Sequence, residues 1–586
     1  MNLQPLLLQQ CSTALHSLFP ERIDQLPASI IEITPATNSK FGHYQCNSAM
    51  KLVKILGSAP RVIAEQIREQ LLKQQAADAQ IFASIEIAGP GFINFTLNPS
   101  YLSQLLSQQL RDPRHGCPLA AVQQKVIIDF SSPNIAKEMH VGHLRSTIIG
   151  DCIARILEFS GHEVLRLNHV GDWGTQFGML ITYLKQHHDT AKIQSLSLSD
   201  LVQAYKQSKQ EFDQNPEFKQ QAQLAVVALQ QGNPESKAIW QSICAISRTA
   251  FEAIYKILDI KLLERGESFY NPMLPEIIAD LEAKNLIKIS DGAKCVYLDG
   301  FTNRDSDPLP LIVQKSDGGY NYATTDMAAV KQRVNTEHGT WLIYVTDAGQ
   351  SLHFSMVFAA ARKAGYYDEQ KVRINHVPFG LVLRADGKKF KTREGETEKL
   401  IDLLQSAVDK AKDILAQRDY PDLSKTELDI MAQTLGINAI KYADLANNRT
   451  SDYSFNLDRM LQFEGNTAAF LSYAYVRVQS IKRKINVDMA KLLVSDLIEL
   501  KTPEEIELGL HALQFADVIQ SFSHDLLPNR LTEYLFVLAE KFHTFFHNCR
   551  VEGMPEQSSR LLLCEAVAQV LAQGFDLLGL KPLQKM

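Results

Sequence analysis

The chain has 586 residues, of which 45% are hydrophobic and 22% charged, and its formal net charge is −6. This length exceeds the roughly 100–200 residues of one domain, so we expect several domains. The acidic balance excludes a polycation that binds nucleic acid indiscriminately, and any RNA must be met by local basic patches. No uninterrupted apolar run reaches about 18 residues, which argues against a membrane span.

The N-terminal residues and the cysteines indicate the compartment. The first basic residue is Arg22, so neither a signal peptide nor a transit peptide is supported. The eight cysteines are scattered without a C-x-x-C pair, which indicates reduced thiols rather than a redox or zinc motif. We therefore expect a cytoplasmic protein.

The first expected domain covers residues 1–115 and mixes helical and strand-like patterns. The segment "PRVIAEQIREQLLKQ" has helical character, whereas "SIEIAGPGFINFTL" reads as strands around a turn, so an α+β domain is predicted. The stretch "RDPRHGCPL" that follows contains Pro and Gly and reads as a linker.

The second expected domain, residues 120–395, contains four short apolar runs that each end in a polar or glycine-containing cluster. These runs are "KVIIDF", "EVLRLNHV", "WLIYV" and "INHVPFG". Such runs are typical of a parallel α/β sheet, whose ligands gather at the carboxyl ends of the strands. About 170 residues separate the second run from the third, too many for one crossover helix, so an insertion is predicted at about 185–315.

After about Gly395 the strands are expected to stop, and residues 396–586 are predicted to be helical, with a bundle at about 456–586. One helical segment, "YAYVRVQSIKRK", interleaves Tyr473, Tyr475 and Arg477 with further basic residues. Such a helix offers stacking rings and phosphate-neutralising cations to RNA. A helical aromatic stripe is, however, more often part of a core than an RNA-binding surface.

The stretch "HVGH" places His140 and His143 at the predicted start of a helix. Pro133 and Asn134 break the preceding strand, and helical apolar spacing begins at about Val141. A helix N-terminus attracts anions, and two imidazoles add hydrogen-bond donors for phosphate oxygens. Gly142 leaves room for a flat base or ribose, although an isolated H-x-x-H is also typical of ordinary surface.

These residues resemble the H-I-G-H signature of class I aminoacyl-tRNA synthetases, and "SSPNIAKEMHVGHLRST" resembles the arginyl-tRNA synthetase version. The strings "HVGDWGTQFG", "DGGYNYATTDMAA", "DAGQSLHF" and "GKKFKTREG" follow in family order. The resemblance implies a Rossmann-like catalytic domain between an N-terminal tRNA-binding domain and a C-terminal helical anticodon-binding bundle. It also implies an arginine–tRNA ligase, which activates L-arginine with ATP and transfers it to the 3′-terminal adenosine of tRNA(Arg), giving AMP and diphosphate.

By the same resemblance, catalysis involves Lys137, His140, His143 and Lys389. ATP binding adds Gly142, Lys388 and Lys391, the lysines lying on a basic hairpin that stands for the family's K-M-S-K-S motif. Thr392 occupies the place of the second motif lysine, and Lys137 is implied as its replacement. Without the neighbouring motifs, the hairpin and Lys137 would read as a solvated turn and a solvated loop lysine.

The substrate pockets also follow from the resemblance. Arginine is expected to bind Asp129, Asn134, Tyr322, Asp326 and Gln350, with Asp326 as the guanidinium partner. A buried Asp that caps a helix would look the same in sequence. The tRNA contacts are expected at Phe92 and Asn94 for the elbow, and at Tyr473, Tyr475, Arg477 and Met586 for the anticodon.

We expect ATP to arrive with Mg²⁺ and expect no structural zinc, no other metal site and no membrane association. The expected partners are tRNA(Arg), ATP and L-arginine, and the expected state is a monomer. The family resemblance also implies that tRNA is needed for adenylate formation. The alternative is a non-catalytic RNA-binding paralogue, which the "HVGH" residues and lysines disfavour because simple RNA binding needs no nucleotide site.

Overall fold

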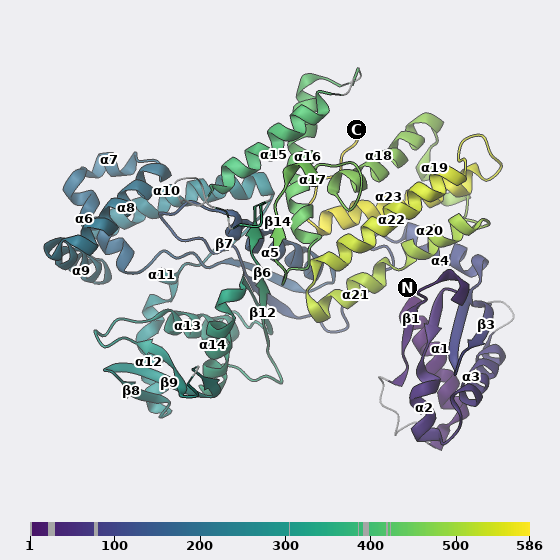
Figure 1. The fold of residues 1–586 in the computed structure, drawn as a ribbon, viewed down its shortest axis with the longest axis horizontal. Helices are drawn as coiled ribbons and strands as arrows, with labels where there is room; N and C mark the ends of the chain where they lie inside the picture. Colours follow the sequence, from purple (N-terminus) through teal and green to yellow (C-terminus); the bar gives the residue numbers. More distant parts are fainter. Residues whose placement is uncertain are drawn as a thin grey trace.

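The computed structural model describes residues 3–21, 30–75, 80–303, 305–384, 386–388, 390, 398–417, 420–421 and 423–586. Figure 1 shows a sheet at the centre of the molecule. The helices of an insertion lie on one side of it, and the N-terminal domain and the last helices lie on the other.

The N-terminal domain is an antiparallel sheet with helices, as the mixed sequence patterns predicted. The strands run in the order β1-β2-β4-β3. Their bounds are β1 (Ile33–Pro35), β2 (Tyr44–Cys46), β3 (Phe82–Ala88) and β4 (Phe92–Leu97), and the helices are α1 (Leu3–Leu18), α2 (Ser48–Leu56) and α3 (Pro60–Gln74).

A fourth helix, α4 (Pro99–Arg111), connects this domain to the C-terminal helices. The Gln109 side-chain amide donates to the carbonyl of Ala512 at 3.0 Å. The backbone amide of Leu500 donates to the Ser103 hydroxyl at 3.0 Å. The two ends of the chain are therefore packed together through α4.

The central sheet has five parallel strands in the order β12-β11-β5-β6-β7. The strands are β5 (Lys125–Asp129), β6 (Glu163–Asn168), β7 (Leu263–Glu264), β11 (Trp341–Asp347) and β12 (Arg373–Phe379). All four predicted apolar runs lie in this sheet, and the short β7 is an addition that the sequence did not predict. The chain leaves β5 toward β6 on one side and β11 lies on the other, so the point where the strand order reverses lies at β5.

The insertion begins as helices: α6 (Thr175–His187), α7 (Thr190–Gln194), α8 (Leu198–Gln214), α9 (Pro216–Gln230) and α10 (Pro234–Leu258). Helices α9 and α10 each start at an Asn-Pro pair, with the Asn side chain accepting from a backbone amide of the first turn. This arrangement satisfies otherwise unpaired amides and uses proline where its fixed φ suits the helix.

After β7 the chain forms α11 (Glu267–Tyr270) and α12 (Leu274–Ala283), and then an antiparallel sheet of three strands. That sheet contains β8 (Ile287–Ser290), β9 (Ala293–Thr302) and β10 (Pro308–Gln314). Two further helices, α13 (Tyr322–Asn335) and α14 (Ser351–Lys363), precede β11 and β12 respectively.

The C-terminal region is helical. Its helices are α15 (Leu400–Leu415), α16 (Lys425–Leu445), α17 (Leu457–Met460), α18 (Ala468–Ile485), α19 (Met489–Ser495), α20 (Pro503–Leu513), α21 (Phe515–Asp525), α22 (Pro528–Asn548) and α23 (Gln557–Leu577). Within the described ranges, none of the helices is long and apolar enough to cross a membrane.

The expectation that strands stop after about Gly395 is wrong at one place. Strand β14 (Tyr453–Ser454) pairs in parallel with β13 (Val382–Leu383). A strand of two residues is too short to show an alternating pattern, so only the tertiary contacts reveal it.

Candidate active site

The loop between β5 and the helix α5 (Val141–Phe159) has an unusual backbone. Ser131, Ser132 and Ala136 have positive φ angles of 74°, 46° and 59°. Non-glycine residues rarely adopt this region, and it persists where the surroundings hold it. Here the loop is held by Gly171, whose amide donates to Pro133 O and whose carbonyl accepts from the Ile135 amide, both at 3.1 Å.

His140 and His143 form a reciprocal cap at the start of α5. His140 is the N-cap, and its Nδ1 accepts from the Gly142 amide at 3.1 Å. The Nδ1 of His143 accepts from the His140 amide at 3.1 Å, and the two ring centroids are 4.0 Å apart. Because both Nδ1 atoms accept, each neutral ring carries its proton on Nε2.

The electrostatic surroundings keep both imidazoles neutral. Burial, together with the charge of Lys137, lowers the pKa of His140. Burial, with smaller effects of His140 and Lys137, lowers the pKa of His143 to about 3. At neutral pH the pair therefore offers two Nε2–H donors at a helix N-terminus, which suits an anionic oxygen.

The basic stretch expected to replace K-M-S-K-S is described only in part. Lys389, Lys391 and Thr392 lie outside the described residues. Lys388 is exposed on a turn in which Arg384 N donates to Lys388 O at 2.7 Å. After this stretch, Lys399 forms an ion pair of 2.8 Å with Glu138, which lies two residues before His140.

The other flank of this stretch is held by Arg145 of α5. Its side chain is fully buried and donates to Gly380 O at 2.7 Å and to Ser451 O at 2.9 Å. It also pairs with Asp444 of α16 at 3.4 Å, and burial raises the pKa of Asp444 to about 6. Both flanks of the basic stretch therefore contact the helix or turn that contains the two histidines.

Asp129, expected in the arginine pocket, already has a guanidinium partner within the protein. It is 6% exposed, and its Oδ2 lies 2.7 Å from Nη2 of Arg333, a buried residue of α13. Its Oδ1 accepts from the Ser132 hydroxyl at 3.0 Å. The carboxylate at the end of β5 thus stabilises the fold around the site.

Asp326 lies on α13 one turn after its start and is half-buried. Its Oδ2 is 2.6 Å from Nε2 of His353, and this hydrogen bond raises the pKa of His353. Glu267 lies near Asp326, and burial together with the charges of Asp172 and Asp326 raises the pKa of Glu267 to about 8. The described residues provide no ion pair for Glu267, so this carboxyl lies buried without a cationic partner, and its raised pKa leaves it largely protonated at neutral pH.

The remaining candidates for arginine binding are more accessible. Tyr322 is 69% exposed, and its pKa is raised by burial of the hydroxyl and by the charges of Glu267 and Tyr205. Gln350 is exposed and donates to Asp347 Oδ2 at 2.8 Å. Asn134 is exposed, and its side chain lies against Gly171. A Cβ added to Gly171 would be only 2.2 Å from Oδ1 of Asn134. Tyr322 therefore lies beside the acidic cluster, whereas Gln350 and Asn134 bind neighbouring loops.

The two elbow candidates differ in accessibility. Phe92 is half-buried at the start of β4. Asn94 is only 6% exposed, and its Oδ1 accepts from the Gln45 amide at 2.9 Å. Gln45 is the half-buried member of this pair and is the one nearer to the surface.

The anticodon candidates on α18 also differ in accessibility. Tyr475 is 9% exposed and its ring packs against Phe575, so the structure places it in the core rather than on an RNA-facing surface. The Arg477 guanidinium lies over the Tyr473 ring, 5.2 Å from its centroid. Met586 is half-buried against the main core.

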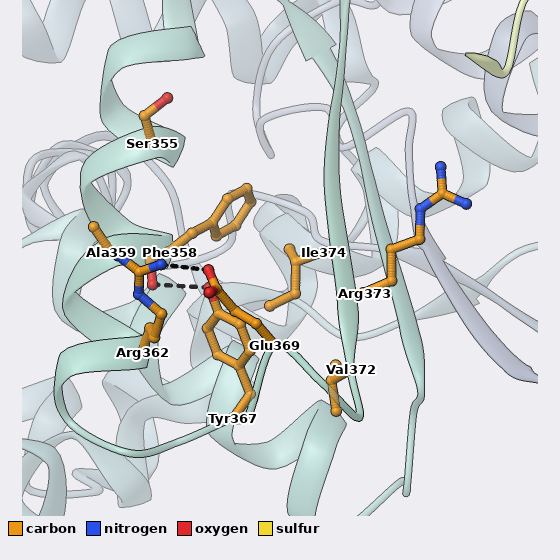
Figure 2. Close-up of a pocket in the computed structure, with 9 residues that line it drawn as sticks. All are labelled: Ser355, Phe358, Ala359, Arg362, Tyr367, Glu369, Val372, Arg373 and Ile374. Atoms are coloured by element: carbon orange, nitrogen blue, oxygen red, sulfur yellow. Dashed lines mark hydrogen bonds and ion pairs between the residues drawn. The ribbon is translucent and has the colours of Figure 1, made fainter. Parts of the chain in front are cut away.

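A separate cavity of about 390 Å³ lies between α14 and the first residues of β12 (Figure 2). An Arg362–Glu369 ion pair crosses it, and Arg373 and Ile374 line it from the strand. None of the residues predicted for the active site lines this cavity. It lies at the amino end of β12, whereas ligands of parallel sheets bind at the carboxyl ends.

Sequence reasoning missed Glu267, Arg145, Arg333 and Tyr205. Glu267 follows the carboxyl end of β7, so recognising that strand would have pointed to it by the same rule that pointed to Asp129. A two-residue strand gives no usable signal. The partners of Arg145 and Arg333 lie far away in the chain, so no local pattern identifies them.

Matches to known protein families identify the class of protein. Residues 102–457 match the family described as "tRNA synthetases class I (R), catalytic domain". Residues 6–97 match the "Arginyl tRNA synthetase N terminal domain", and residues 471–586 match the "DALR anticodon binding domain". The chain therefore has the three parts of a class I aminoacyl-tRNA synthetase of this type.

The relatives give the particular family. The chain is 57% identical over 557 residues to the arginine–tRNA ligase of Protochlamydia amoebophila, covering 95% of this chain and 94% of the relative. It is 51% identical to that of Chlamydia abortus over 100% of both chains. The solved arginyl-tRNA synthetase of Plasmodium falciparum is 34% identical with a TM-score of 0.85, and 99% of each chain is covered. The chain belongs to the arginyl-tRNA synthetase family.

Proposed function

We propose that this chain ligates L-arginine to tRNA(Arg) in two steps, with the residues of α5 and its preceding loop acting on ATP. The arginine carboxylate attacks the α-phosphate, diphosphate leaves, and the arginyl group then passes to the 3′-terminal adenosine. The observation that carries this proposal is the His140–His143 cap, which holds two neutral Nε2–H donors at a helix N-terminus.

The phosphate side uses hydrogen bonds and cations. His140 and His143 donate to phosphate oxygens, and Gly142 keeps the backbone between them uncovered. Lys137, Lys388, Lys389 and Lys391 supply positive charge, with Lys137 in place of the missing motif lysine. Charge that develops on the leaving diphosphate is best stabilised by cations already fixed in position. Mg²⁺ arrives with ATP as part of the substrate complex.

The arginine side uses the acidic cluster beside α13. Asp326 and Glu267 receive the guanidinium, whose planar set of donors matches carboxylates. Tyr322, Asn134 and Gln350 complete the pocket, and Asp129 shapes it through Arg333. The raised pKa of Glu267 beside Asp326 supports this choice, because a cationic substrate would favour the ionised form of Glu267 and offset the repulsion between the two carboxylates.

The tRNA side uses both flanks of the chain. Phe92 and Asn94 form the elbow contact, and Tyr473, Arg477 and Met586 form the anticodon contact. Arg483 of α18 donates to Gln584 O at 3.2 Å, which supports a shared surface for α18 and the C-terminal residues. We also propose that the chain is a monomer. We propose that it works in the cytoplasm, which the eight buried free cysteine thiols support.

Arginine-dependent ATP–pyrophosphate exchange tests the function. We expect exchange with arginine alone among the amino acids, and only when tRNA is present. Charging with cysteine or glutamate would contradict the substrate. Binding of RNA without any exchange would instead support the non-catalytic paralogue.

Lys137→Ala tests the role of the lysine. The variant should lower the adenylation rate by roughly 10²–10³, the usual scale for one lost charge-stabilising donor. Binding of tRNA should change little, because one lysine adds little to a large electrostatic surface. Lys371→Ala, at a lysine whose side chain is 80% exposed, serves as the matched control. A near-normal exchange rate for Lys137→Ala would exclude this role.

A further inference from the structure

A residue of the insertion contacts the proposed phosphate-binding lysine. The Lys137 ammonium lies over the ring of Tyr205, 5.6 Å from the ring centroid. Tyr205 belongs to α8, a helix that contains none of the signature motifs. This helix ends more than a hundred residues before β11, the third of the predicted strands. An aromatic face attracts a cation at this separation.

The fold, rather than Lys137, places the Tyr205 ring. Helix α8 buries Leu201, Ala204 and Ser208 on one face, and Tyr205 stands at the edge of that face, packed against the main core. A side chain on a packed helix has few conformations, whereas a lysine on a loop has many. The ring is therefore the fixed partner and the lysine the mobile one.

A second contact anchors α8 to the signature loop. Lys399 Nζ lies 2.8 Å from Glu138 Oε1 and donates to the Ser199 hydroxyl of α8 at 3.1 Å. Glu138 follows Lys137 directly in the chain. The first turn of α8 and the loop with Lys137 are thus held together on one side, and Tyr205 meets Lys137 on the other.

Tyr205 also lies close to the proposed arginine pocket. Its hydroxyl, together with Glu267, contributes to the raised pKa of Tyr322. Tyr205 therefore contacts the proposed phosphate-binding cation and is also near a residue proposed for the arginine pocket. A residue at this point can limit the positions that the ammonium samples without contacting the substrate itself.

We propose that Tyr205 is a positioning residue that holds the Lys137 ammonium toward the reacting phosphates through its aromatic face. The inference rests on the proposed role of Lys137 and makes the insertion part of the catalytic arrangement. The ring replaces some of the water around the ammonium before ATP binds. The Lys137 side chain therefore loses less conformational freedom when the transition state forms.

The test compares variants of Tyr205 in arginine-dependent ATP–pyrophosphate exchange with tRNA present. Tyr205→Leu should lower kcat by about 2- to 5-fold, the scale of one exposed cation–π contact, while the KM for ATP and for arginine stays within about 1.5-fold. Tyr205→Phe keeps the ring and should retain most of the rate. An equal loss in Tyr205→Phe and Tyr205→Leu would overturn the claim that the ring face is responsible.

The same helix offers a matched control. The ring of Phe212, which is also partly buried on α8, has the ammonium groups of Lys209 and Lys219 at 5.7 and 5.6 Å from its centroid. Phe212→Leu removes these contacts of the same type away from the signature loop and should leave kcat unchanged. Thermal midpoints of the Phe212 and Tyr205 variants should agree, so a loss of kcat in Tyr205→Leu alone is not a loss of fold.

A double variant separates the two proposals. Lys137→Ala with Tyr205→Leu should be no slower than Lys137→Ala, because the ring then has no ammonium to hold. Additive losses would show that Tyr205 acts elsewhere and would overturn the inference. If Lys137→Ala is slow but Tyr205→Leu is normal, the inference fails while the role of Lys137 stands. If Lys137→Ala is itself normal, the proposed role of Lys137 fails.

Discussion

Asp129 and Asp326 were both predicted to bind arginine, and the structure gives them opposite surroundings. Asp129 is buried and pairs with Arg333, whose side chain is 1% exposed. Asp326 is half-buried and its partner is His353, whose charge depends on pH. One carboxylate is neutralised permanently by the fold, and the other remains able to exchange its partner for a substrate.

The charged neighbours of Asp129 and Asp326 also differ. A full cation lies against Asp129, whereas Asp326 and Asp172 both act on the buried Glu267 and help to raise its pKa. Burying charges without compensation is costly, and a ligand of opposite charge removes that cost. The comparison predicts that a carboxylate at a strand end or helix start can bind a cationic substrate only where the fold leaves it without a permanent partner.

The largest expected effect is on stability, at Asp129. Asp129→Asn leaves the Arg333 guanidinium buried without its counter-charge, which should cost about 3–5 kcal/mol of unfolding free energy. Urea unfolding followed by tryptophan fluorescence measures this, because Trp341 lies in β11 beside β5. Asp326→Asn is the control and should barely move the midpoint. An unchanged midpoint for Asp129→Asn with a raised arginine KM would mean that Asp129 is a substrate ligand after all.

The next effect is on substrate binding, at Asp326. Asp326→Asn replaces a charge-assisted hydrogen bond by a neutral one and should raise the arginine KM about 10- to 100-fold, corresponding to about 1.5–3 kcal/mol. The KM for ATP should stay the same. A change confined to ATP would place Asp326 on the phosphate side of the site.

A pH effect is expected at Glu267, whose pKa is raised from 4.5 to about 8 by burial and by Asp172 and Asp326. The folded chain then holds a proton that the unfolded chain releases, so this group reduces stability as pH rises from 4.5 to about 8. A bound guanidinium favours the carboxylate, so arginine should bind more tightly as pH approaches 8 and should release a proton. Calorimetry in two buffers of different ionisation enthalpy measures the release, which Glu267→Gln should abolish. Proton release that persists in that variant would assign it to another group.

The smallest effect is expected at His353. Its hydrogen bond to Asp326 raises its pKa above 6.5, so its contribution to stability is present below pH 6.5 and is lost as pH rises through the raised pKa. The protonated imidazole competes with arginine for Asp326, so the arginine KM should fall as pH rises through this range. His353→Gln in the Glu267→Gln background should flatten the remaining dependence. An unaltered profile would show that His353 stays neutral in the working range.

Local sequence patterns were sufficient to predict most of the elements around the site. Continuous apolar runs predicted four strands of the central sheet, because strands buried on both faces show no alternation. The break at Pro133 and the helical spacing from about Val141 placed His140 and His143 at the start of a helix, and the structure has His140 as its N-cap. These signals are local, since hydrogen bonds of helices and turns join residues a few positions apart.

The availability of polar groups to a ligand depends instead on contacts between distant segments of the chain. Asp129 and Arg333 are 204 positions apart, and Arg145 reaches Ser451 across 306 positions. Strands β7 and β14 exist because other segments lie beside them, and Glu267 joins the site only through β7. Tyr475 is in the core because α23 covers it, although its sequence context would suit RNA equally well. A residue's type fixes what it can bind, but its burial and its partners depend on chain segments that no local pattern specifies.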